Sequence, residues 1–431
     1  LVVSDGRRVL FTSEHEGERD LYSVRFDGED LQRLTREGTR PDDLQEIDDE
    51  TVAYLTGKGT IARIGVDGTA GDPVPFSARY AVDRRAERAV VFDEVWRALR
   101  ERFYDPDFHG VDWQAMRAVY EPWALDASHD ADFADVVNLM LGELNASHMG
   151  YYPPPQEGGE TSGWLGVRFD PTAGGPGILV RQVLPDSPAS RHDVSIVPGE
   201  RILAVGGETV AESANVYELL VDTAGRRVPI LLQGADGTER TVVVTPVRFS
   251  ELDQLRYREW VRQRRALVDE LAGGRIGYVH IQSMDIPSFE TFERDLHAAA
   301  HGREALLIDV RSNGGGWTTD YLLAVLTVRR HAYTVPRDAD PTEKVYPQSR
   351  LPLAAWTRPA ATLCNEDSYS NAEIFSHAFK TLERGPLVGT PTFGAVISTG
   401  GTRLINGAWV RLPFRGWFVA GTDANMERIG A

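Results

Sequence analysis

A chain of 431 residues is too long for a single hydrophobic core, and its length predicts about three domains. The net charge of −18 argues against a protein that binds nucleic acid or an anionic membrane surface. Cys364 is the only cysteine, which excludes an intrachain disulfide and a cysteine-based metal site, and we expect it to be a buried thiol.

The two ends of the chain add further expectations. It opens on Leu1 with neither an initiator methionine nor the charged and apolar regions of a signal peptide, and it closes on Ala431 without a tail. We therefore expect an internal fragment of a longer protein. No run of about 18 apolar residues is present, so no transmembrane helix is predicted.

Residues 1–81 consist of short apolar runs separated by turn sequences. Arg8–Thr12, Asp20–Val24 and Leu31–Thr35 form one such group, and a looser copy follows over 51–68, at a period of roughly 40 residues. Strand repeats of this length are typical of propeller blades, so the segment predicts the last blades of a truncated β-propeller. A plain β-meander is the alternative.

Residues 82–163 are predicted to form a small helical domain. The first helix carries an apolar stripe at helical spacing: Phe92, Val95, Trp96, Leu99 and Phe103. Asp112 is placed to cap a second helix, and a third is expected over 131–144. Prolines and glycines over 153–163 then predict a flexible link.

Residues 164–248 have the pattern of a small β domain. Strands are expected over 166–169, 178–183, 201–205, 228–233 and 241–246, with a helix over 215–221. The motifs around Ser187–Ala189 and Pro198–Leu203 resemble those of PDZ domains in bacterial proteases. Such domains bind an extended peptide along a sheet edge, although a spacer between neighbouring domains is the alternative.

After a helix expected over 252–271, the chain alternates strands and helices to its end, which predicts a parallel sheet. Ala305–Trp317 is an apolar strand that ends in three consecutive glycines. Thr362–Phe375 is an apolar run followed by a polar turn and the start of a helix. The carboxyl edge of such a sheet is where α/β enzymes place their chemistry, and the pair favours a hydrolase.

Three motifs of this last region carry a family resemblance. They are Arg275–Ile281 (RIGYVHI), Asp309–Gly316 (DVRSNGGG) and Asn365–Phe375 (NEDSYSNAEIF). The chain resembles tricorn protease and, more distantly, the C-terminal processing peptidases, over essentially its whole length. The resemblance implies a multidomain fold: a propeller end over 1–81, a helical part of the protease core over 82–163, a PDZ domain over 164–248, and a truncated α/β catalytic domain of the processing-peptidase or crotonase-like type over 249–431.

The nucleophile implied by the resemblance is Ser370, a serine at the start of a helix. The first free N–H groups of that helix would point at whatever the serine attacks. Ser368 is the nearby competitor. A purely structural alternative is that Ser370 caps the helix by accepting a hydrogen bond from the N–H of Glu373.

The two groups of enzymes that the chain resembles use different general bases. Processing peptidases use a lysine where this chain has Ala395, and Lys380 lies too far along the helix after Ser370 to replace it. Tricorn-like enzymes use a histidine of the helical domain, which implies His148, preceded by Ser147. An imidazole with an ordinary pKa near 6.5 would suit proton transfer at neutral pH. A solvated histidine at a helix end is the alternative.

The resemblance also implies the groups around this pair. Glu427 would orient and charge-stabilise His148 through Ser147, whereas the alternative is a surface glutamate. The N–H groups of Gly316 and Asn371 would form the oxyanion hole. Asp309 and Arg311, beside the glycines, are expected to be structural.

One departure concerns substrate choice. Tricorn has an acid that accepts basic P1 side chains, and the matching position here is Thr334, within His331–Pro336. Asp338 and Asp340 follow closely and are the candidates to replace that acid. A trypsin-like preference is therefore not implied.

The leading hypothesis is a tricorn-like serine endopeptidase that needs no metal or organic cofactor and acts on peptides or unfolded polypeptides. The alternatives are a catalytically inactive peptide-binding scaffold and an acyl-processing enzyme of the crotonase type, for which a PDZ domain has no purpose. The resemblance further implies a cytoplasmic protein that forms a homo-oligomer, a hexamer in this family. No nucleic acid or membrane partner is expected.

Overall fold

The computed structural model describes the chain except residues 1–2, 4–5, 15–16, 37, 78, 80, 155–160, 212–214, 330–332, 334, 336, 338–339, 341 and 343–354. The chain divides into two compact units, Leu1–Asp83 and Arg84–Ala431. No helix of the described residues is long and apolar enough to cross a membrane.

The first unit consists of two antiparallel sheets with three strands each. Their strands are β1 (Arg8–Ser13), β2 (Asp20–Arg25) and β3 (Gln32–Arg33), then β4 (Asp42–Asp48), β5 (Thr51–Leu55) and β6 (Ile61–Gly65). A shared core includes Leu10, Leu21, Val52 and Ile64. Each repeat of the sequence thus forms one small sheet of three strands, and the described strands do not close a ring, so the propeller end stays a prediction.

The second unit begins with three helices around one core. They are α1 (Arg84–Arg102), α2 (Trp113–Leu125) and α3 (Asp130–Gly142), with a 3₁₀ turn η1 (Phe108–Gly110) before α2. Asp112 caps α2 by accepting a hydrogen bond from the N–H of Ala115 at 3.0 Å. The apolar stripe of α1 is buried against α2 and α3, as its spacing predicted.

The C-terminal strands complete this helical core, which the sequence did not predict. β18 (Ile397–Arg403) and β19 (Trp409–Gly416) form an antiparallel hairpin, and β19 pairs with β7 (Gly150–Tyr152). Val410 and Leu412 are buried with the helices, whereas Arg411 between them points to the other face. The expectation of parallel strands to the chain end was therefore wrong. The strand β19 buries alternate residues against a single core, as antiparallel strands commonly do, whereas parallel strands are usually covered on both faces. A short pair, β20 (Phe418–Val419) and β21 (Ala424–Asn425), follows.

The PDZ-like region forms a six-stranded sheet in the order β13-β12-β10-β9-β8, with β11 paired to β10. Its elements are β8 (Val167–Asp170), β9 (Ile178–Val183), η2 (Pro188–Ser190), β10 (Arg201–Val205), β11 (Glu208–Thr209), η3 (Glu218–Leu220), β12 (Val228–Gln233) and β13 (Glu239–Val244).

The helix expected over 215–221 is only the 3₁₀ turn η3. The side chain of Asn215 accepts a hydrogen bond from the N–H of Tyr217 at 3.2 Å, a local turn that competes with helix formation. The carbonyl of Leu220 accepts a hydrogen bond from the N–H of Gly163 at 2.7 Å, so the segment before β8 occupies a carbonyl group that a longer helix would use.

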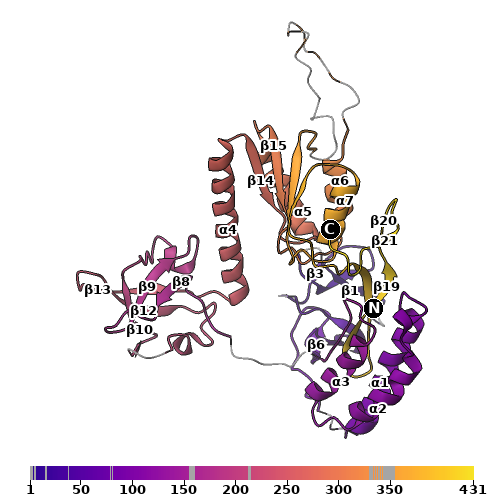
Figure 1. Ribbon diagram of the computed structural model, residues 1–431. Coiled ribbons are helices and arrows are strands. Elements are labelled where there is room, and N and C mark those ends of the chain that lie inside the picture. Colours follow the sequence, from indigo (N-terminus) through magenta and orange to yellow (C-terminus); the bar gives the residue numbers. More distant parts are fainter. Residues whose placement is uncertain are drawn as a thin grey trace. The chain divides into compact units, whose positions relative to one another are not determined.

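The remaining part is a parallel four-stranded sheet in the order β14-β15-β16-β17. In chain order its elements are α4 (Phe249–Ala272), β14 (Ile276–His280), α5 (Ile286–Ala300), β15 (Ala305–Asp309), α6 (Thr319–Leu326), β16 (Ala360–Cys364), α7 (Asn371–Thr381) and β17 (Leu387–Gly389). Helices α4 and α5 pack on β14 (Figure 1). Helix α7 packs on β16 and β17. The carboxyl ends of the central strands β15 and β16 therefore lie side by side at one edge of the sheet.

Candidate active site

Ser370 lies in the sharp turn between β16 and α7. Its backbone has φ 57° and ψ −118°, a conformation that costs a residue with a side chain about 1–3 kcal/mol and is found mainly at functional sites. The N–H of Glu373 donates to the carbonyl of Ser370, not to its hydroxyl. The hydroxyl oxygen lies instead 2.8 Å from Nε2 of His148. The side chain of Ser370 is thus aimed at an imidazole and does not cap the helix.

Ser368, the competing serine, has a different environment. It is fully buried, and its hydroxyl donates to the carbonyl of Val310 at 2.8 Å while accepting from the N–H of Asn365 at 3.1 Å. These contacts close the turn after β16. Among the described residues, no histidine or lysine makes a hydrogen bond to this hydroxyl.

His148 follows α3 and precedes β7, with a left-handed backbone at φ 61°. It is buried, with 7% of its surface exposed, which differs from a solvated histidine at a helix end. The ring of Tyr369 stacks on the imidazole with centroids 4.5 Å apart, and its hydroxyl lies 3.1 Å from Nδ1. Pairing of β7 with β19 fixes the segment that carries His148.

Burial changes the proton affinity of this imidazole. It lowers the pKa of His148 from 6.5 to about 4, and the positive charge of Arg411 acts in the same direction. The expectation of an ordinary pKa near 6.5 is therefore wrong for the free protein. His148 is neutral at pH 7 and can accept a proton from Ser370.

Ser147 and Glu427 extend the hydrogen-bonded chain beyond His148. The hydroxyl of Ser147 lies 2.7 Å from Nδ1 of His148 and donates to Glu427 Oε2 at 3.1 Å. Glu427 is buried, and it also accepts from the N–H of Ser147 at 2.7 Å and from the N–H of Val396 at 2.8 Å. These bonds favour the tautomer of His148 with a proton on Nδ1, which leaves Nε2 as the acceptor facing Ser370.

Two backbone N–H groups near Ser370 have no hydrogen-bond partner in the described part of the chain. One belongs to Asn371, the first residue of α7, whose side chain is held by the N–H and hydroxyl of Thr319 at 3.0 Å each. The other belongs to Gly316, whose neighbours Gly315 and Trp317 make the bonds to Met284. The loop lies against Ser370, since a Cβ on Gly315 would be 2.6 Å from the Cβ of Ser370.

Gly316→Ala should lower the melting temperature clearly. Gly316 has φ +144°, and a Cβ there would lie 2.0 Å from the carbonyl oxygen of Met284, so the loop must move. The cost should be about 1–3 kcal/mol or more. Gly314→Ala is the matched control, because a Cβ at Gly314 would meet no atom within 4 Å. Equal melting temperatures for the two variants would contradict this reading of the loop.

No lysine takes part in the described network. Ala395, at the lysine position of the processing peptidases, is 1% exposed, and its N–H donates to Glu373 at 2.9 Å. Lys380 is exposed near the far end of α7. The structure therefore brings Ser370 together with His148, Ser147 and Glu427, and with neither of these positions.

The sequence did not predict several residues that lie in this site. Glu373 is fully buried and holds the backbone N–H of Ser370 at 3.0 Å. Asn313 is also fully buried, and it shapes the glycine loop by donating to the carbonyl of Ile281 and accepting from the N–H of Gly315. The three-residue spacing from Ser370 to Glu373 is that of a capping box, which could have revealed Glu373. No local signal marks Tyr369 as the partner of His148.

The predicted substrate-binding position Thr334 lies outside the described residues, as does Asp338. Asp340 accepts hydrogen bonds from the N–H and hydroxyl of Thr342 at 2.8 and 2.7 Å. Two large aromatic side chains next to the site are open to solvent, Trp317 at 57% and Phe393 at 63% exposed.

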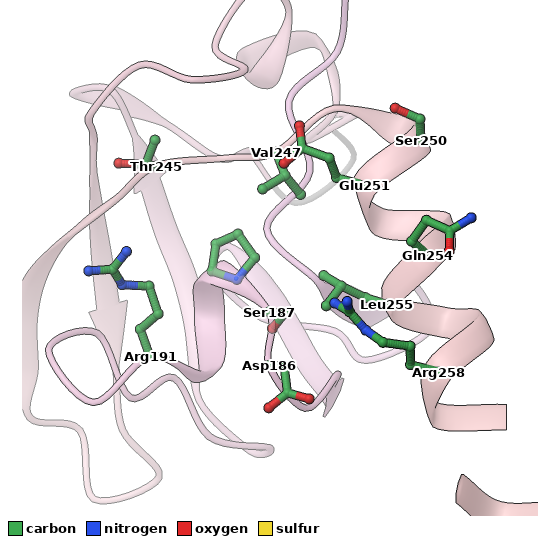
Figure 2. A pocket seen from close by; sticks show the side chains of 11 residues that line it. Asp186, Ser187, Arg191, Thr245, Val247, Ser250, Glu251, Gln254, Leu255 and Arg258 are labelled. Carbon is green, nitrogen blue, oxygen red and sulfur yellow. The ribbon is translucent and has the colours of Figure 1, made fainter. Parts of the chain in front are cut away.

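A separate cavity of about 620 Å³ lies between the PDZ-like region and α4. Figure 2 shows Asp186, Ser187 and Arg191 on one side of it and Glu251, Leu255 and Arg258, from α4, on the other. None of its lining residues takes part in the network around Ser370.

Three models of known protein families match parts of this chain. The model of peptidase family S41 matches residues 275–430, and the chain belongs to this superfamily. Models of the tricorn protease C1 domain and of the tricorn protease PDZ domain match residues 84–142 and 182–248. The chain is thus a tricorn-like member of the superfamily, as its motifs predicted.

Individual relatives agree with this assignment. The chain is 35% identical over 367 residues to Tricorn protease homolog 1 of Streptomyces coelicolor, a match that covers 82% of this chain and 33% of the relative. It is 26% identical over 355 residues to Tricorn protease of Thermoplasma volcanium, a match that covers 79% of this chain and 33% of the relative. The chain therefore spans about a third of the length of these curated relatives.

A solved structure, the crystal structure of the tricorn protease, has the same fold. It superposes with a TM-score of 0.78 at 23% sequence identity, over 99% of this chain and 42% of that one. The predicted multidomain fold, with helical, PDZ and α/β peptidase parts, is confirmed by this match and by the three domain models.

Proposed function

We propose that this chain is a serine peptidase that hydrolyses peptide bonds through an acyl-enzyme on Ser370. The observation that carries the proposal is the continuous chain of hydrogen bonds from Glu427 through Ser147 and His148 to Ser370. A nucleophile, a base and a group that orients the base are the parts that acyl transfer by serine requires.

In the acylation step Oγ of Ser370 attacks the carbonyl carbon of the scissile bond. Nε2 of His148 removes the hydroxyl proton as the bond forms and then gives it to the leaving amine. The negative charge that develops on the carbonyl oxygen is stabilised by the free N–H groups of Gly316 and Asn371, each of which contributes roughly 3 kcal/mol to the lowering of the barrier.

In the deacylation step the same groups act on water. His148 accepts a proton from the water that attacks the ester, and Ser370 leaves with that proton. The imidazolium that forms in each step donates from Nδ1 to Ser147, whose hydroxyl donates to Glu427. Burial and Arg411 disfavour this cation, so the buried carboxylate supplies the compensating charge.

The proposal is tested by incubating the full chain with a mixed peptide library in H₂¹⁸O and analysing the products by mass spectrometry. A peptidase should release fragments whose new carboxyl group carries ¹⁸O. The alternative reading, a catalytically inactive peptide-binding scaffold, predicts retention of peptides without new fragments. That outcome would overturn the proposal.

Cleavage should not require arginine or lysine at P1. Thr334 stands where tricorn has an acid, and burying a charged side chain without a partner costs several kcal/mol. The exposed rings of Trp317 and Phe393 support a preference for apolar side chains. A peptide library that varies only P1 measures this. A tenfold or greater preference for arginine over leucine would show that a carboxylate, such as Asp338 or Asp340, reaches the subsite.

Assembly and location are further proposals that rest on the family alone. We expect peptides or unfolded polypeptides as substrates, a homo-oligomer, a hexamer by family resemblance, and a cytoplasmic location. Light scattering on the purified protein would measure the assembly, and a monomer at micromolar concentration would contradict it.

A further inference from the structure

The acidic side chain of Glu373, in the first turn of α7, is fully buried beside the nucleophile. Oε1 accepts from the N–H of Ser370 at 3.0 Å and from the N–H of Ala395 at 2.9 Å. Oε2 accepts from the hydroxyl of Thr392 at 2.7 Å and from the N–H of Gly394 at 2.5 Å. Three of these four partners are backbone N–H groups, which can only donate, so both oxygens act as acceptors.

The four bonds join two segments that are distant in sequence. One is the turn at Ser370, whose strained backbone needs support from its surroundings to persist. The other is the loop 392–396, which also reaches the base, because the N–H of Val396 donates to Glu427. Glu373 and Glu427 thus hold consecutive N–H groups of the same loop, at Ala395 and Val396.

We propose that Glu373 is a positioning residue of this peptidase, which holds the strained turn of Ser370 in register with the loop that anchors Glu427. The side chain does not touch the reacting atoms. It sets where Oγ of Ser370 lies relative to Nε2 of His148, and it couples the nucleophile to the acidic end of the hydrogen-bonded chain. This inference rests on the proposed function and deepens it.

The test is Glu373→Gln in the full chain. The amide has one acceptor oxygen and turns an NH₂ group towards two of the four donors, so either Ser370 or Gly394 loses its partner. The probe is a fluorophosphonate, which bonds to an activated serine. We expect its rate constant at saturation, kinact, to fall about 100-fold, because a small misplacement of a reacting group has effects of this size. The half-saturating concentration KI and the final labelled fraction should stay near the wild-type values.

Asp309→Asn is the matched control. Asp309 is also fully buried in the same sheet domain, but it pairs with Arg311 at 2.6 Å and with the hydroxyl of Tyr278 at 2.8 Å, and not with Ser370. This variant should lower the melting temperature without changing kinact. If Glu373→Gln does not fold, Glu373→Asp decides, because it keeps the charge but is one methylene too short to reach both segments.

The outcomes separate the inference from the proposed function. An unlabelled wild-type chain would overturn the function, and the inference with it. A labelled wild-type chain, together with a Glu373 variant that has a normal kinact and a reduced final labelled fraction, would show that Glu373 only stabilises the fold. That result would overturn the inference alone.

Discussion

Replacing Ser370 with alanine should abolish peptide hydrolysis while the melting temperature stays close to that of the wild-type protein. Loss of the nucleophile removes acylation, and such losses lower kcat by about 10⁴–10⁶-fold. The hydroxyl of Ser370 bonds to His148 and not to the helix, so its removal breaks no bond of the fold. Steady-state kinetics and calorimetry on the same preparation measure both effects.

Ser368→Ala is the control for this prediction. It removes a buried hydrogen bond to Val310 and should lower the stability by about 1 kcal/mol while leaving turnover nearly intact. The opposite pattern, with Ser370→Ala active and Ser368→Ala inactive, would move the nucleophile to Ser368.

The pH dependence of kcat/KM should report a base that stays neutral well below pH 7. Burial, aided by Arg411, lowers the pKa of His148 to about 4. Above that pH the imidazole is neutral and can accept the proton of Ser370, and below it the protonated ring cannot. The profile should therefore be flat between about pH 6 and 8 and fall with a midpoint near pH 4.

His148→Ala should lower kcat by about 10⁴-fold or more and remove this acidic limb. Short assays from stopped-flow pH jumps keep acid unfolding out of the measurement. A wild-type profile that rises only above about pH 9 would point to a lysine as the base, contrary to the buried Ala395 at the lysine position.

Local patterns predicted the elements that carry the site. The strand before the glycines, the turn before α7 and the stripe on α1 are all features of neighbouring residues, and each lies where its spacing indicated. The choice of Ser370 over Ser368 needed the family motif, because both serines lie in the same polar turn. Only the backbone conformation at Ser370 explains why its hydroxyl leaves the helix cap free.

Long-range contacts account for most of what the sequence could not give. The burial of His148 depends on Tyr369, more than two hundred residues away, and on the pairing of β7 with β19. The lowered pKa of His148 follows from that burial. The sequence around His148 predicts only its position at a helix end, and so it could not predict this pKa. Similarly, Glu427 resembles a surface residue in sequence, but it is buried, and the N–H groups of Ser147 and Val396, both distant in sequence, donate to it.

The central claim is that one serine, Ser370, is activated by a histidine from the helical domain. Fluorophosphonate labelling of the full chain, followed by proteolytic digestion and mass spectrometry of the labelled peptide, tests it most directly. We expect a single adduct on Ser370, formed rapidly in the wild-type protein and at least about 10³-fold more slowly in His148→Ala. No adduct, an adduct on Ser368, or equal labelling of the His148 variant would contradict it.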